Sequence, residues 1–105
     1  MRRGEIWWAD LPQPAGRRPV LLLSRDEAYV VRNFVIMSPL TTRRQGLRTE
    51  VELGPAEGLS RTSVVNLDVI ITESKQRLEE RIISLSLDKL RAVDESIRFA
   101  LGLEP

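Results

Sequence analysis

The pattern of hydrophobic and polar positions along this chain predicts a series of short strands followed by one helix. Strict alternation in 49–53 predicts a strand with Val51 and Leu53 facing inward, because side chains of a strand point alternately to its two faces. The run from Val20 to Leu23 is too short for an ordinary helix and suits a strand covered on both faces. The predicted strands are 4–11, 20–24, 33–40, 49–53, 63–72 and a short one around 81–83.

Proline, glycine and polar residues separate these strands. Pro19 is expected to open the second strand, where a missing N–H costs little, and Pro39 to stop or bulge the third. Two prolines and a glycine within 12–16 predict an exposed, mobile loop before the second strand. The other predicted connections are turns at 26–29 and 54–58, a polar loop at 41–48 and one helical turn at 74–78.

The last predicted element is an amphipathic helix that begins at the N-cap Ser86, carries Asp88 in its first turn and ends at Gly102. Its apolar residues recur at helical spacing on one face, which we expect to cover the sheet. That face consists of Leu87, Leu90, Val93, Ile97 and Leu101. Strands around one core, capped by a helix, predict a mainly β (α+β) fold, a small partly closed antiparallel barrel of SH3-like character. At 105 residues and 42% hydrophobic composition, we expect a single domain, 1–105.

The composition narrows the chemistry by what it lacks. The chain has no cysteine and no histidine, which excludes Ser–His triads, thiolate metal sites and most zinc sites. Any catalysis must therefore use Arg, Lys, Ser, Thr, Tyr, Asp or Glu, and we expect no metal and no other cofactor. The chain has no apolar run of 18 residues and no signal-peptide core, so we expect a cytoplasmic protein that makes no contact with a membrane.

Charge is distributed unevenly along the chain. The formal net charge is +1, but residues 1–48 carry a balance of +5 and residues 49–105 a balance of −4. An arginine-rich half indicates a polyanionic partner, although solvated surface faces produce the same asymmetry.

Arg17 and Arg18 stand where the 12–16 loop meets the second strand. Paired guanidinium groups at such a junction suit a phosphate site, since each offers five donors in a fixed fork and stays charged. The local sequence alone favours the other interpretation, two solvated surface arginines.

Several segments, in the same order, resemble the MazF/PemK toxins over nearly the whole chain. The segments are Gly-Glu-Ile-Trp-Trp-Ala-Asp-Leu at 4–11, Gly-Arg-Arg-Pro-Val at 16–20, Ser-Pro-Leu-Thr-Thr at 38–42, Thr-Glu-Val at 49–51, Ser-Val-Val-Asn-Leu-Asp at 63–68 and the terminal helix. The resemblance implies the CcdB/PemK barrel, a homodimer, and a sequence-specific, ribosome-independent endoribonuclease that cleaves single-stranded RNA. It also implies a cognate antitoxin, which we expect to bind through an acidic disordered C-terminal segment.

The resemblance further implies that Arg18 and Thr41 form the catalytic pair. The expected RNA-binding residues lie in the two loops that flank this pair: Gln13, Arg17, Thr42, Arg43, Arg44 and Arg48. Similar toxins often carry a glutamate in the first loop where this chain has Gln13, so the identity of the general base stays open. The attacking group we expect is the 2′-hydroxyl of the RNA itself, whose placement beside phosphorus supplies much of the effective concentration without a metal.

Two other function classes remain open at this point. One is a non-enzymatic topoisomerase poison on the same barrel, resembling CcdB, although that branch relies on a C-terminal Trp-Gly-Ile and this chain ends Leu-Glu-Pro. The other is an SH3-like interaction module, for which the five aromatic residues provide no evident peptide groove.

Overall fold

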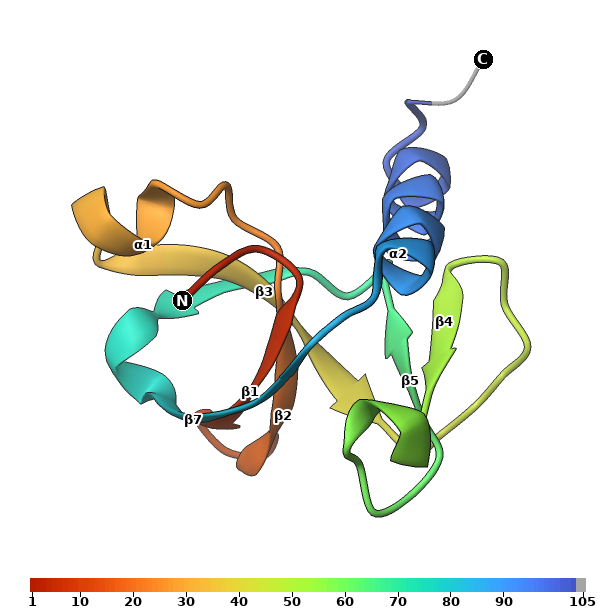
Figure 1. The fold of residues 1–105 in the computed structure, drawn as a ribbon, viewed down its shortest axis with the longest axis horizontal. Coiled ribbons are helices and arrows are strands. Elements are labelled where there is room, and N and C mark those ends of the chain that lie inside the picture. Colours follow the sequence, from red (N-terminus) through yellow and green to blue (C-terminus); the bar gives the residue numbers. More distant parts are fainter. Residues whose placement is uncertain (104–105) are drawn as a thin grey trace.

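The computed structural model describes residues 1–103, which form a curled antiparallel sheet of seven strands with a helix across one end (Figure 1). The strand order is β4-β5-β3-β2-β1-β7, and β6 pairs with the first half of β3. This confirms the predicted mainly β, partly closed barrel with a C-terminal helix. The elements are β1 (Glu5–Asp10), β2 (Arg17–Leu22), α1 (Ala28–Val31), β3 (Phe34–Thr41), β4 (Glu50–Leu53), η1 (Pro55–Glu57), β5 (Ser63–Asn66), β6 (Ile71–Ser74), η2 (Lys75–Arg77), β7 (Leu78–Ser84) and α2 (Leu87–Ala100).

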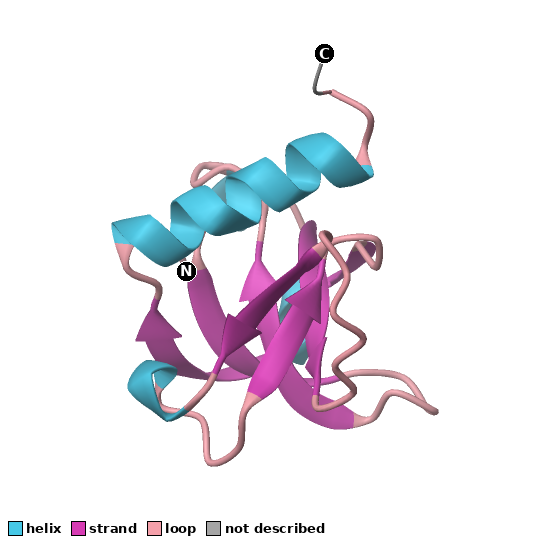
Figure 2. Cartoon of the chain, turned by 90° about the vertical axis from the view of Figure 1, so that its right-hand side faces the viewer, coloured by secondary structure: helices cyan, strands magenta, loops and turns pink. Residues whose placement is uncertain are grey.

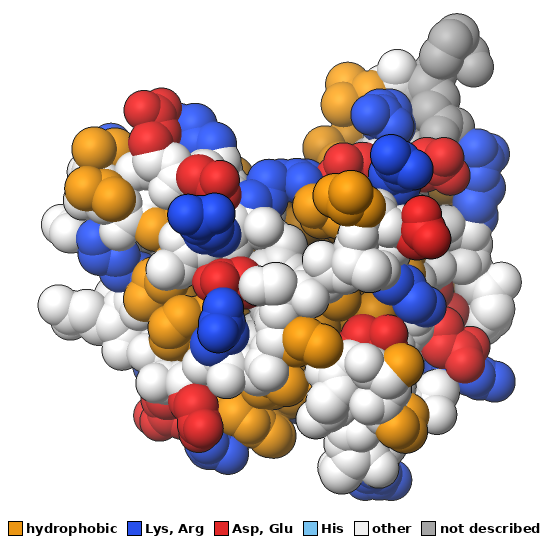
Figure 3. All heavy atoms as spheres, in the orientation of Figure 1, with side chains coloured by type: hydrophobic (Ala, Val, Ile, Leu, Met, Phe, Trp, Pro, Cys, Tyr) orange, Lys and Arg blue, Asp and Glu red, His pale blue; other side chains and the backbone are white. Residues whose placement is uncertain are grey.

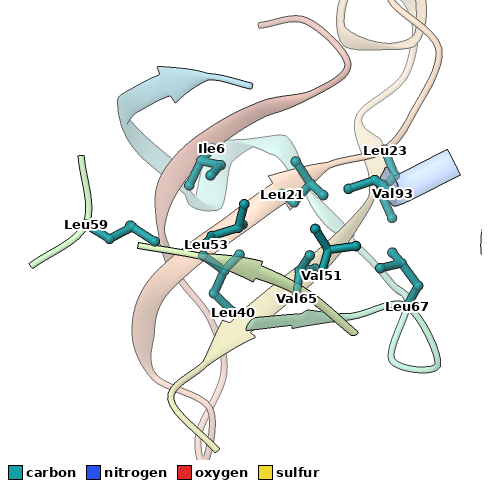
Figure 4. Packing of buried hydrophobic residues seen from close by; sticks show 10 residues of the cluster. All are labelled: Ile6, Leu21, Leu23, Leu40, Val51, Leu53, Leu59, Val65, Leu67 and Val93. Carbon is teal, nitrogen blue, oxygen red and sulfur yellow. The ribbon is translucent and has the colours of Figure 1, made fainter. Parts of the chain in front are cut away.

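The interior consists of two hydrophobic clusters on the two faces of the sheet. The larger cluster lies under α2 and includes Ile6, Leu21 and Val93 (Figure 4). The smaller one includes Val20 and Leu22. Alternate residues of β2 therefore enter different clusters, which confirms that its continuous apolar run is covered on both faces.

β2 begins earlier than the sequence indicated. Arg17 and Arg18 already pair with β1, so they belong to the strand, and the prediction of two arginines at the end of a mobile loop was wrong. Pro19 is the third residue of the strand rather than the first. Pairing of β2 with β3 begins only at Val20, so Pro19 has a neighbouring strand on the β1 side alone. A residue without a backbone N–H is tolerated there, because no ladder hydrogen bond to β3 is lost.

β3 does not stop at Pro39 as predicted but continues to Thr41. Its pairing with β6 ends at Met37, and its pairing with β5 begins at Leu40. Pro39 falls between these two ladders, so its missing N–H interrupts neither of them.

The long β-branched run 63–72 is two strands, β5 and β6, rather than one. Asn66 causes the break, because its side-chain oxygen accepts the N–H of Asp68 at 3.0 Å and closes a turn. Ser38 of β3 fastens this turn by donating to the carbonyl oxygens of Asn66 and Val69, at 3.3 and 2.6 Å.

Three shorter segments were predicted with mixed success. The expected polar turn at 26–29 leads into α1, a single helical turn whose Tyr29 is buried. The helical turn expected at 74–78 is confirmed as η2, with Ser74 as its N-cap. The last strand begins at Leu78 rather than near Arg81 and pairs along β1.

The helix α2 begins at the predicted N-cap, where the Ser86 hydroxyl accepts the N–H of Lys89. Gly102 ends it with a φ of 70°, a left-handed conformation that favours glycine. The predicted apolar face is wrong at both ends, since Leu87 is 71% and Leu101 58% exposed. Figure 2 shows α2 lying across one end of the sheet. The residues that pack there are Ala92, Val93, Ser96, Ile97 and Ala100. No helix within residues 1–103 is long and apolar enough to cross a membrane.

Candidate active site

Arg18 and Thr41 line one cleft of about 200 Å³ at the end of the sheet. The antiparallel pairing of β2 and β3 explains why they meet. Val20 is paired with Pro39, and the same register continued by two residues sets Arg18 opposite Thr41. We call this the Arg18 cleft. Its lining residues are Arg18, Pro39, Thr41, Arg43, Gln45, Glu50, Asn66 and Val69.

The Arg18 side chain is half-buried and held by two backbone carbonyls. Its Nε donates to Ala15 O at 2.9 Å, and one terminal nitrogen donates to Leu40 O at 3.4 Å. A guanidinium has five N–H donors, so three remain for a ligand in the cleft. The carbonyl of Ala15 comes from the first loop and that of Leu40 from the residue before Thr41, so Arg18 ties both walls of the cleft together.

The Thr41 hydroxyl is oriented by its neighbour. It accepts the backbone N–H of Arg43 at 3.2 Å, so its own hydrogen is available to donate. Arg18 and Thr41 together therefore offer a fixed cation and a neutral donor on one side of the cleft. Such a pair suits the oxygens of a phosphate group.

The arginines of the Arg18 cleft differ from others nearby in their ion pairs. Within residues 1–103, Arg18 and Arg43 take part in none of the ion pairs. Arg17 pairs with Glu79 and Arg44 with Glu52, each at 2.8 Å. The two charged halves of the sequence therefore neutralise each other over much of the surface, and Figure 3 shows acidic and basic side chains interspersed. On the face that Figure 3 shows, the charge asymmetry along the chain does not become a single basic patch.

Of the six predicted RNA-binding residues only Arg43 lines the Arg18 cleft, and the two in or beside the first loop, Gln13 and Arg17, lie outside it. Strand alternation turns Arg17 to the face opposite Arg18, where its guanidinium lies 4.3 Å from the centre of the Trp8 ring. Gln13 is exposed in the first loop, with its side chain beside Gly16.

The predicted residues of the second loop, 42–48, are divided among several clefts. Arg43 lines the Arg18 cleft, and Arg44 lines an adjoining cleft that shares Glu50 with it. Thr42 lines a separate apolar cleft beside Trp8. Arg48 lies 4.1 Å over the Phe99 ring of α2, away from Arg18.

Three polar residues of the Arg18 cleft were not predicted as site residues: Gln45, Glu50 and Asn66. Alternation around Val51 implied that Glu50 faces outward, but not which neighbour it faces. The order β4-β5-β3 decides this, because Glu50 pairs with Asn66 and both lie on the same sheet face as Pro39 and Thr41. Glu50 is the carboxylate that lines the cleft, and within residues 1–103 no group of three or more acidic side chains is arranged so that it could hold a metal ion.

Two titratable groups are perturbed away from the cleft. Burial raises the pKa of Glu5, but hydrogen bonds from Trp7, the Arg2 backbone and Arg81 outweigh it, so the net pKa lies below its ordinary value. Burial raises the pKa of Tyr29 to about 12. Trp7 packs against the smaller cluster, and its indole N–H donates to Glu5.

Residues 2–101 match the family model described as PemK-like, MazF-like toxin of type II toxin-antitoxin system. The chain belongs to the PemK/MazF toxin family. It is 37% identical over 100 residues to a Mycobacterium tuberculosis protein called probable endoribonuclease MazF5, covering 94% of this chain and 91% of that one. It is 38% identical over 103 residues to probable endoribonuclease MazF2 of the same species, covering 97% and 99%.

Solved structures agree with this family assignment. The Mycobacterium tuberculosis toxin MazF-mt6 has a TM-score of 0.88 at 33% identity, covering 96% of this chain and 99% of that one. An endoribonuclease in complex with its cognate antitoxin, from a mycobacterial species, has a TM-score of 0.89 at 28% identity, covering 100% and 98%. These relatives favour the ribonuclease over the topoisomerase poison and the interaction module.

Proposed function

We propose that this chain is an endoribonuclease toxin that cleaves single-stranded RNA at selected sequences, with Arg18 and Thr41 as its catalytic residues. The observation that carries the proposal is the Arg18 cleft, in which an arginine that forms no ion pair within residues 1–103 lies opposite an oriented hydroxyl. Family membership supplies the substrate class, because the similar mycobacterial proteins are named endoribonucleases.

In the proposed reaction the 2′-hydroxyl attacks the neighbouring phosphorus. The O2′–P bond forms, the P–O5′ bond breaks, one proton leaves the 2′-hydroxyl and one joins the departing 5′-oxygen. The products are a 2′,3′-cyclic phosphate and a 5′-hydroxyl. Charge builds up on the non-bridging phosphate oxygens, where the N–H groups of Arg18 and the hydroxyl of Thr41 stabilise it. No step requires a metal, because the nucleophile belongs to the substrate.

The proposed RNA-reading surface surrounds this pair. Arg43 and Gln45 are the best placed for base or phosphate contacts, since both line the Arg18 cleft. Thr42 and Arg44 line neighbouring clefts, and together with Arg48 they act on flanking nucleotides. Gln13 and Arg17 lie outside the cleft, and Arg17 faces the other side of the sheet, so we assign them contacts only with RNA that extends beyond the cleft. Unpaired bases offer their edges to such loops, which is how single-stranded RNA is read.

We propose that a cognate antitoxin inhibits this chain with an acidic, disordered segment. The support is electrostatic, because Arg18 and Arg43 attract carboxylates for the same reason that they attract phosphates. Family members from Mycobacterium and from Deinococcus radiodurans have been solved with their antitoxins. An antitoxin peptide is expected to compete with RNA, so binding of both at once would contradict this part of the proposal.

The same proposal includes a homodimer that acts in the cytoplasm. Large apolar side chains stay exposed on α1 and the start of β3, and others on α2, which leaves surface for a second copy. They are Val30, Val31, Phe34 and Ile36 in the first group, and Leu87, Phe99 and Leu101 in the second. Light scattering of the purified protein is expected to give twice the monomer mass.

The main test incubates purified protein with a long single-stranded RNA in chelator and maps the new ends. We expect a small set of recurrent cuts, each with a 5′-hydroxyl and a cyclic or hydrolysed 3′ phosphate. The Arg18→Ala protein, purified in parallel, controls for contaminating nucleases. Equal cleavage by that variant, or random cuts, would contradict the proposal.

A further inference from the structure

The Glu50 carboxylate is surrounded by backbone N–H groups of the 42–48 loop. One carboxylate oxygen accepts the N–H of Gln45 at 3.1 Å and that of Leu47 at 3.2 Å, and the other oxygen accepts Gln45 at 3.2 Å. The backbone N–H of Glu50 donates in turn to the carbonyl of Leu47 at 3.0 Å. One side chain thus binds both ends of the 45–47 segment.

Gly46 makes this arrangement possible. Its φ of 70° lies in the left-handed region, where an L side chain is strained. The turn at Gly46 brings the N–H groups on either side of it toward the same point. Successive backbone N–H groups arranged in this way form a concavity that binds an anion, and here the anion is the Glu50 carboxylate.

The position of Glu50 is costly for phosphate binding. The carboxylate lines the same cleft as Arg18 and Arg43, so it repels any phosphate bound between them. Both of its carboxylate oxygens accept backbone N–H groups of the loop. This geometry favours a role in holding the loop over a role in the chemical step.

The loop that Glu50 holds carries the residues that face the substrate. Gln45 is bound to Glu50 directly, and Arg43 lies two residues earlier, fastened to Thr41 by its N–H. The nearby Glu52 contacts the same loop differently, through an exposed ion pair with the Arg44 side chain. Such an exposed pair constrains a backbone little.

We propose that Glu50 is a positioning residue for RNA selection: it fixes the 42–48 loop so that Arg43 and Gln45 face the Arg18 cleft. The inference rests on the proposed ribonuclease function for its substrate. Losing the carboxylate leaves Arg18 and Thr41 in place but lets the loop adopt other conformations. Discrimination between RNA sequences then falls more than the rate of the chemical step.

Three variants test this. Glu50→Gln removes the charged acceptor, Gly46→Ala strains the turn without touching any charge, and Glu52→Gln is the matched control on the same strand. Amide hydrogen exchange is measured first, since it does not depend on activity. We expect the amides of Gln45 and Leu47 to exchange at least about tenfold faster in the first two variants, the size expected when charge-assisted hydrogen bonds are lost, and near the normal rate in Glu52→Gln.

Cleavage is then measured as kcat and KM on one preferred oligonucleotide and on versions altered at one base. The ratio of kcat/KM between preferred and altered RNA is expected to fall about tenfold in Glu50→Gln and in Gly46→Ala, with kcat on the preferred RNA changed only a few-fold. The double variant is expected to match the single ones, because both break one contact.

Two results would overturn the proposal. One is unchanged exchange at Gln45 and Leu47 in Glu50→Gln. The other is a loss of kcat in Glu50→Gln that Gly46→Ala does not reproduce, together with loss of the acidic limb of the pH–rate profile in Glu50→Gln. That pattern would identify Glu50 as a proton acceptor. Failure of the wild-type protein to cleave RNA would instead refute the proposed function, and the exchange measurement would still decide whether Glu50 holds the loop.

Discussion

Replacement of Arg18 by alanine separates the two roles that the structure gives this side chain. Arg18 binds the carbonyls of Ala15 and Leu40, and it presents its remaining donors to the cleft. Arg18→Ala therefore removes a donor to the reacting phosphate and also two hydrogen bonds that hold the cleft walls. The substitution therefore has a structural cost as well as a catalytic one.

The two effects differ in size. Loss of one donor that stabilises transition-state charge lowers kcat by about 10²- to 10³-fold. Loss of two hydrogen bonds from a charged, half-buried group reduces the free energy of unfolding by about 1–2 kcal/mol. For a domain of this size that lowers the melting temperature by roughly 5–15 °C. The variant should therefore be folded but nearly inactive at a temperature well below its own melting point.

The assay compares Arg18→Ala, Arg18→Lys and Arg17→Ala. Single-turnover cleavage of one oligonucleotide is measured at a temperature where thermal melting shows all proteins folded. Arg18→Lys keeps the positive charge but loses the planar guanidinium and its fixed N–H donors, so its cleavage rate should fall between those of wild type and Arg18→Ala. Arg17→Ala removes a guanidinium that faces Trp8 and Glu79, so its kcat should stay within about tenfold of normal. Cleavage by Arg18→Ala at more than a tenth of the wild-type rate, or an equal loss in Arg17→Ala, would refute the assignment.

Four further outcomes are expected. Thr41→Val should lower kcat by about 10²-fold or more with little change in melting temperature, and near-normal kcat would remove Thr41 from the catalytic pair. A 2′-deoxy nucleotide at the cut should block cleavage while chelator leaves it unchanged; strict dependence on magnesium would exclude the internal nucleophile. Because the folded-state pKa of Glu5 lies below its ordinary 4.5, its contribution to stability is present above that pH and lost below it. The urea midpoint of unfolding should therefore fall less between pH 7 and pH 3 in Glu5→Gln than in wild type. An equal fall in both proteins would contradict this. The pKa of Tyr29 is raised from 10.0 to about 12, so its contribution to stability is present below pH 10 and lost as pH rises toward 12. Tyr29→Phe should therefore lose less stability than wild type between pH 10 and pH 12, as followed by circular dichroism, and equal losses would contradict this.

Family resemblance allowed the sequence to indicate a pair that lies 23 positions apart along the chain. The residues alone favoured two solvated arginines over a phosphate site at Arg17 and Arg18. The β2–β3 register decides between them, since it sends Arg18 into the cleft and Arg17 to the opposite face. Strand alternation is a local property, but which face becomes the cleft depends on the neighbouring strand.

The sequence by itself determined those features that depend on neighbouring residues. The alternation around Val51, the N-cap at Ser86 and the glycine after α2 act over a few positions, so they were read correctly. Strand ends near Pro19 and Pro39 were misread, because the cost of a missing N–H depends on whether a partner strand lies on that side.

Only the tertiary structure decided what shares the cleft with the predicted pair. Glu50 reaches it because β5 lies between β4 and β3, a strand order that no local pattern specifies. The same order brings acids of the second half to arginines of the first, as between Arg17 and Glu79, which offsets part of the charge asymmetry. Both results come from contacts between residues far apart in the chain. Such contacts are set by how the sheet closes around its core, and a reading of adjacent residues does not contain that information.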